Sequence, residues 1–197
     1  HRDYPLRGRA GQTLAVSLST PDGRTAFSIT PPGTDSAMFP ESASDKHFER
    51  ILPVDGQYVI RVFSTGVAPI AGGSSAYTLH TRLSGKPLVA RPNRSDARIP
   101  GTPFHASASI TCAHGPAPDG LPCQALVIRR GFDGGATVEI RHPGAHAPIR
   151  RILFIKGEPV SSDAAEPLRH ARQGDLSIIL IGSGERFEIP DALVFGG

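Results

Sequence analysis

The sequence lacks tryptophan, is poor in aromatic residues and contains no long hydrophobic run. Nine Phe and three Tyr are its only aromatic side chains in 197 residues. No apolar stretch approaches the ~20 residues of a transmembrane helix, so we expect no membrane span. A signal peptide is also missing, and His1 stands directly before a predicted strand. We therefore expect the native N-terminus to lie upstream of His1.

Cysteine is scarce, since only Cys112 and Cys123 are present. The residues between them, A-H-G-P-A-P-D-G-L-P, must turn, and two cysteines that bracket a turn indicate a disulfide in an oxidising compartment. Free thiols and a zinc site are the alternatives. Zinc would need two more ligands, with His105 and His114 as the candidates, and the spacing matches no standard zinc pattern. We expect a disulfide, no metal, no cofactor, and a periplasmic or secreted location.

The chain also lacks a strong charge of one sign, with a formal net charge of +3 at pH 7. The positive excess lies in residues 86–103, which hold Lys86, Arg91, Arg94 and Arg98 against the single acid Asp96. A nucleic-acid-binding protein presents its basic residues on a folded element. The pattern here predicts a solvated basic linker and no nucleic-acid partner.

Recognisable catalytic motifs are absent as well. Gly182–Gly184 reads G-S-G but has no strand-to-helix context of the kind that a nucleophile elbow needs. His142 and His146 share a Pro-Gly loop, which would fix neither ring for a metal. We expect no enzyme. A weaker alternative is a hydrolase that uses two of the late carboxylates, because glycosidases work with such a pair; these are Asp163, Glu166, Asp175, Glu185, Glu188 and Asp191.

Alternating hydrophobicity between short Gly, Pro and Asp turns is what the sequence has in abundance. Leu14, Val16 and Leu18 alternate with polar or small residues, and Tyr58, Ile60 and Val62 repeat the pattern. Such alternation is typical of half-buried strands, and a series of them predicts an all-β fold. We predict a jelly-roll-like antiparallel β-sandwich over residues 1–85, a Pro-rich basic linker over 86–103, and a small β-rich domain with the disulfide over 104–197.

Strands are predicted in the first domain over 4–9, 13–19, 26–30, 37–39, 47–52, 57–63 and 76–83. In the second domain they are predicted over 104–112, 123–130, 136–142, 149–155, 176–181 and 185–189, with residues 131–135 as a hairpin connection. The only helix expected is a turn or so around Asp163–Leu168.

The first domain resembles the bacterial inhibitors of g-type lysozyme, and more distantly the pre-peptidase C-terminal domains. The resemblance covers about residues 3–83 and rests on D-Y-P-L-R-G-R-A-G-Q-T-L-A-V-S-L from Asp3, F-S-I-T-P-P-G from Phe27, H-F-E-R-I-L-P-V-D-G-Q-Y-V-I-R-V from His47, and A-Y-T-L from Ala76. The C-terminal domain resembles the tails of uncharacterised secreted bacterial proteins, on R-Q-G-D-L from Arg172 and E-R-F-E-I-P-D-A-L-V-F-G-G from Glu185.

The resemblance implies a binding protein that inhibits a lysozyme-like wall hydrolase by inserting a loop into its cleft. The loop Ser64–Ser75 has no charged residue, so contacts there would use backbone groups, Thr65, Val67 and Ile70, with Tyr77 following the loop. Binding of this kind should depend only weakly on salt. The alternative is a module that binds carbohydrate or the cell envelope without inhibition. The partner is accordingly expected to be a lysozyme or a wall glycan.

Overall fold

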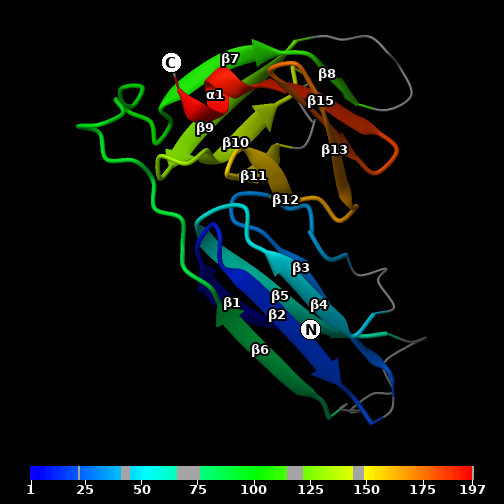
Figure 1. The fold of residues 1–197 in the computed structure, drawn as a ribbon. Helices are drawn as coiled ribbons and strands as arrows, with labels where there is room; N and C mark the ends of the chain where they lie inside the picture. Colours follow the sequence, from blue (N-terminus) through cyan, green and yellow to red (C-terminus); the bar gives the residue numbers. More distant parts are fainter. Residues whose placement is uncertain (22, 41–44, 66–75, 115–121, 144–148, 197) are drawn as a thin grey trace.

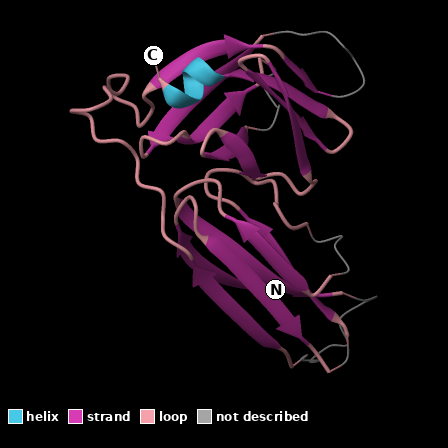
Figure 2. Cartoon of the chain, viewed as in Figure 1, coloured by secondary structure: helices cyan, strands magenta, loops and turns pink. Residues whose placement is uncertain are grey.

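The computed structural model describes residues 1–197 except 22, 41–44, 66–75, 115–121, 144–148 and 197 (Figure 1). Its described part is all-β, with one short helix (Figure 2). Antiparallel pairing joins the strands into four sheets within these described ranges. No helix in the described part is long and apolar enough to cross a membrane.

The first six strands form two three-stranded sheets that pack face to face, called here the N-terminal sandwich. One sheet has the order β1 (Arg2–Gly8), β5 (Gly56–Ser64), β3 (Thr25–Thr30), and the other has the order β4 (His47–Ile51), β2 (Thr13–Ser19), β6 (Thr78–Ser84). Their inward residues share one core, which includes Leu14, Val16, Tyr58 and Ile60. The period-two alternation is therefore confirmed, since these side chains are at most 1% exposed.

The remaining strands form a five-stranded and a four-stranded sheet, called here the C-terminal sheets. The five-stranded sheet has the order β12 (Glu158–Ser162), β11 (Arg150–Ile155), β10 (Gly135–Arg141), β9 (Cys123–Arg130), β7 (Ala106–Ile110). The four-stranded sheet has the order β13 (Leu168–Gln173), β14 (Leu176–Ile181), β15 (Glu185–Pro190), β8 (Cys112–His114). Helix α1 (Asp191–Phe195) adds Leu193 and Val194 to the same core.

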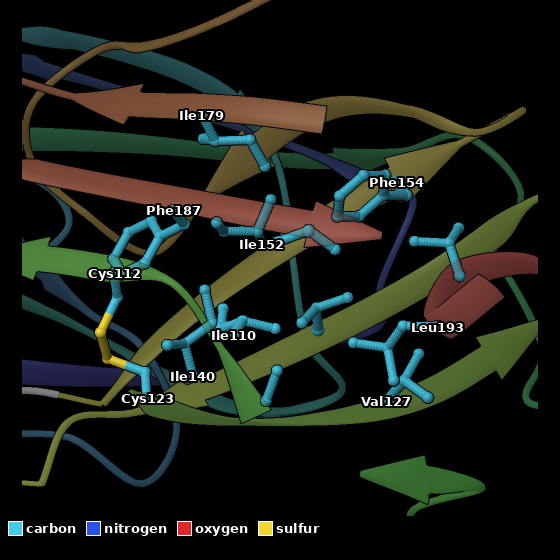
Figure 3. Packing of buried hydrophobic residues seen from close by; sticks show 14 of the residues in the cluster. Ile110, Cys112, Cys123, Val127, Ile140, Ile152, Phe154, Ile179, Phe187 and Leu193 are labelled. Carbon is cyan, nitrogen blue, oxygen red and sulfur yellow. A yellow bond between two sulfur atoms is a disulfide. The ribbon is translucent and has the colours of Figure 1, made fainter. Parts of the chain in front are cut away.

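The predicted disulfide is confirmed. Cys112 and Cys123 are bonded, with Cα atoms 5.8 Å apart, and both residues are at most 1% exposed. Figure 3 shows the bond between β8 and β9 at the edge of the C-terminal core, close to Phe187 and Ile140. A buried disulfide is compatible with an oxidising, extracellular type of environment.

The helix expected around Asp163–Leu168 is wrong. Residues 163–166 make bends between β12 and β13, and Leu168 already pairs with Ile181. Asp163 is 2% exposed and accepts a hydrogen bond from the backbone N–H of Arg151 at 2.9 Å. This long-range contact outweighs the local helix propensity of Ala164 and its neighbours. The strand expected over 37–39 is reduced to an isolated bridge between Phe39 and Ile29, and β12 and β13 were not anticipated.

The N-terminal sandwich and the C-terminal sheets are joined by side chains that donate to backbone carbonyls across the boundary. The Arg50 guanidinium donates to the carbonyl of Ala164 at 2.6 Å. Ser161 Oγ donates to the carbonyl of Ile51 at 2.6 Å, and Thr137 Oγ1 donates to that of Pro53 at 2.8 Å. Such bonds fix orientation because a misplaced donor would leave a buried carbonyl unsatisfied.

In the segment 86–103, Lys86, Arg94 and Arg98 are exposed, but the expected solvation does not hold for Arg91 and Asp96. Arg91 is 9% exposed, and its guanidinium lies 3.1 Å from the carboxylate of Asp96, which also accepts from Arg129 at 3.0 Å. Backbone bonds add to this, since Leu88 donates to the carbonyl of Ala10 and Arg91 donates to that of Arg129. Local composition indicated a free linker, but Arg129 on β9 supplies a partner that no local pattern shows.

A candidate ligand-binding groove between β1 and β6

The two lateral edges of the N-terminal sandwich differ in how they are closed. At the β3–β4 edge, Met38 and Phe39 follow β3 and are buried, and Met38 donates its backbone N–H to the carbonyl of Ile29 at 2.8 Å. Lys46 Nζ donates to the carbonyl of Thr25 at 2.6 Å on the same side. This edge is therefore covered by chain.

The opposite edge, between β1 and β6, is hollowed. A cavity of about 440 Å³ opens there, lined by Tyr4, Pro5, Leu6, Ile60, Tyr77, Thr78, Leu79 and Thr81. Sequence alternation places apolar side chains of both strands toward the gap, so its floor is apolar, while the threonine hydroxyls at its margin are exposed. An apolar floor with a few polar groups at the margin is the usual composition of a small-molecule site.

Two tyrosines meet across this opening. The hydroxyls of Tyr4 and Tyr77 lie 2.6 Å apart, within hydrogen-bond distance, although the residues are 73 positions apart in sequence. Arg2 places its guanidinium 5.3 Å from the centre of the Tyr4 ring. The hydrogen bond with Tyr4 raises the pKa of Tyr77 above its ordinary value, so the Tyr77 hydroxyl keeps its proton at neutral pH and can both donate and accept.

A second hollow, of about 740 Å³, follows the same two strands toward the C-terminal sheets. It is lined by Arg7, Gly8, Arg9, Gln12, Asp55, Gly56 and Leu83. Arg7 and Gly8 follow Leu6 on β1, and Leu83 follows Thr81 on β6. The two hollows share no lining residue but follow one another along β1, and the pair is called here the β1–β6 groove.

The predicted binding residues fall in three places. Tyr77 lines the β1–β6 groove, although its role in binding remains a prediction. Thr65 is exposed just after β5, and its backbone N–H donates to the carbonyl of Arg24 at 2.6 Å. Val67 and Ile70 lie outside the described residues.

Sequence reasoning missed Tyr4, Thr78 and Thr81 as site residues. One signal could have found Tyr4: Pro5 interrupts the alternating run at its middle, and proline within a strand indicates an edge strand. A tyrosine beside it is then a residue at a sheet margin. The sequence around Tyr4 does not indicate that β6 lies opposite β1, because that arrangement arises from the packing of the two sheets.

Most late carboxylates are held in ion pairs, which leaves little support for a hydrolase. Arg150 bridges Asp163 at 3.1 Å and Glu185 at 2.7 Å. Burial raises the pKa of Asp163, opposed by the Arg151 backbone N–H and by Arg150, but at 2% exposure no substrate reaches it. Glu188 pairs with Arg186, and Asp191 pairs with Arg172. The absence of catalysis stays a prediction.

One His/Cys cluster appears in the described residues. The Sγ atoms of Cys112 and Cys123 and a ring nitrogen of His142 lie within 4.8 Å of one another. Both sulfurs belong to the disulfide, so neither is a thiolate that could bind a metal. His146, the second histidine of the loop, lies outside the described residues.

Comparisons with known proteins find no matching family model, no matching curated protein and no matching solved structure. The resemblance to inhibitors of g-type lysozyme is therefore neither supported nor contradicted by them.

Proposed function

We propose that this chain is an exported, non-catalytic binding protein, and that its N-terminal sandwich binds a glycan in the β1–β6 groove. The observation that carries the proposal is the Tyr4–Tyr77 pair across an otherwise open sandwich edge. The buried disulfide supports the exported location, because such bonds persist in oxidising compartments.

A sugar ring fits the chemistry of this groove. Its C–H faces can pack on tyrosine rings and on Leu6 and Leu79, while its hydroxyls can bond to tyrosine and threonine oxygens. An added peptide strand fits β1 less well. Pro5 has no N–H, so this edge lacks one donor that a continuous ladder would use.

The test is titration of the full chain with soluble wall-glycan fragments by calorimetry. Tyr77→Ala should weaken binding by about tenfold, roughly 1.4 kcal/mol, because it removes a ring and its hydroxyl. Tyr77→Phe should weaken it less, since the ring stays. Phe132→Ala is the matched control, because Phe132 is an exposed aromatic residue (71%) outside the groove. Equal weakening by Phe132→Ala, or no binding to any glycan, would rule the proposal out.

The inhibitor hypothesis is tested beside it. The inhibitor hypothesis depends on residues 66–75, which lie outside the described part of the chain. The geometry of the groove therefore gives no support to inhibition. Inhibition of g-type lysozyme by the full chain, lost on deletion of 65–73 but retained in Tyr77→Ala, would assign that function to the loop instead of the groove.

A further inference from the structure

The β1–β6 groove is flanked by arginines for which the described part of the chain provides no ion-pair partner. Arg7 and Arg9 line its second hollow and are exposed. No carboxylate in the described part of the chain lies within ion-pair distance of either guanidinium. Arg2 stands at the other end, beside the Tyr4 ring.

The acids beside the groove are already neutralised. Asp3 accepts two hydrogen bonds from Arg61, both at 2.8 Å. Asp55 accepts from the backbone N–H of Ala10 at 2.8 Å and from Arg130 at 3.0 Å. Asp55 itself lines the second hollow, but its charge is offset by Arg130, so Arg7 and Arg9 leave an excess of positive charge there.

The two hollows of the groove lie along the length of β1. Strand β1 has seven residues, which at about 3.3 Å each spans about 23 Å. Arginines at both ends of such a length, with tyrosines and threonines between them, match a chain ligand that carries repeated negative charge and sugar rings. Guanidinium groups bind carboxylates through paired hydrogen bonds.

We infer that the β1–β6 groove binds an acidic glycan, meaning a linear polysaccharide with carboxylate groups on its sugar rings. This inference rests on the proposed glycan-binding function and names the class of glycan. Tyr4 and Tyr77 hold a ring at one end, and Arg7 and Arg9 pair with carboxylates at the other.

The experiment compares two probes that differ only in charge: oligogalacturonate and its fully methyl-esterified form. The full chain should bind the acid at least tenfold more tightly than the ester at about 50 mM salt, and this preference should shrink to a few-fold at about 500 mM. The double change Arg7→Gln with Arg9→Gln should remove most of the preference for the acid, because it should weaken binding of the acid much more than binding of the ester. The double change Arg94→Gln with Arg169→Gln, at two exposed arginines away from the groove, removes the same charge; it is the matched control and should change neither.

Each other outcome is decisive. Equal binding of acid and ester overturns the acidic class but leaves the glycan function standing. Loss of preference in the double change Arg94→Gln with Arg169→Gln as large as in the groove variant assigns the effect to net charge and overturns the site. Polyglutamate that binds as tightly as oligogalacturonate, in competition with it, shows that sugar rings are not recognised. Binding of none of these probes or of wall glycan overturns both proposals.

Discussion

Replacing Asp55 with Asn should destabilise the folded chain by about 2 kcal/mol, although the side chain keeps its size. Asp55 pairs with Arg130 across the boundary between the N-terminal sandwich and the C-terminal sheets, at 3.0 Å. Removing one partner of a fully buried pair costs about 3–5 kcal/mol. Because the Asp55 side chain is 44% exposed, water replaces part of the lost interaction, and we discount the cost to about 2 kcal/mol.

The cost arises at Arg130. Its side chain is 1% exposed, and burial lowers its pKa despite the nearby Asp55. It donates to the carbonyl of Leu88 at 2.8 Å and to Thr137 Oγ1 at 2.9 Å. These neutral acceptors stay in the variant, but they do not balance the charge. Asp55→Asn would thus leave an uncompensated cation in the interior.

A double-mutant cycle isolates this term. In an Arg130→Met background the cation is gone, and Asn can still accept from the Ala10 N–H, which now bonds to Asp55. Asp55→Asn should then cost less than about 0.5 kcal/mol, which gives a coupling of about 1.5 kcal/mol. Urea unfolding followed by far-UV circular dichroism measures it, since the chain has no Trp to report by fluorescence.

Asp175→Asn is the control, because Asp175 is an exposed turn residue. Its effect should stay within about 0.5 kcal/mol. If Asp55→Asn costs the same in the Arg130→Met background as in the parent chain, the argument from the buried guanidinium is wrong.

Three further predictions concern the disulfide, the connecting segment and one glycine. Ellman reagent should find no free thiol in the unfolded, unreduced chain. Reduction of the Cys112–Cys123 disulfide, whose cysteines are 11 residues apart, should lower the free energy of unfolding by about 3 kcal/mol in urea. Trypsin should cut the segment 86–103 after the exposed Arg94 or Arg98, since proline follows Lys86 and Arg91 and blocks cleavage there. The nicked halves should still co-elute on gel filtration; separate elution would show that their polar contacts do not hold. Gly134→Ala should lower the free energy of unfolding by at least about 1 kcal/mol, and the melting temperature with it. The φ of Gly134 is +81°, and a Cβ there would lie 2.6 Å from the backbone nitrogen of Gly157. An unchanged melting temperature would contradict this.

Local pattern predicted most of the strands because alternation depends on few neighbours. Leu14, Val16 and Leu18 show by themselves which face of their strand is buried. The Gly- and Pro-rich sequence between Cys112 and Cys123 likewise indicated the disulfide. The two-domain division remains a prediction, for which trypsin is the test.

Only the tertiary structure decided where distant residues meet. Tyr77 could be singled out from its own stretch of sequence, but Tyr4 becomes its partner because β1 and β6 are the free edges of two sheets that pack together. Asp163 does not lie in the predicted helix, because Arg150 and Arg151 on a neighbouring strand donate hydrogen bonds to its carboxylate. In both cases the deciding contact joins residues that are far apart in sequence, and hydrophobic periods of two or 3.6 residues carry no information about such contacts. These contacts depend on which sheet edges stay open and which charges are buried together.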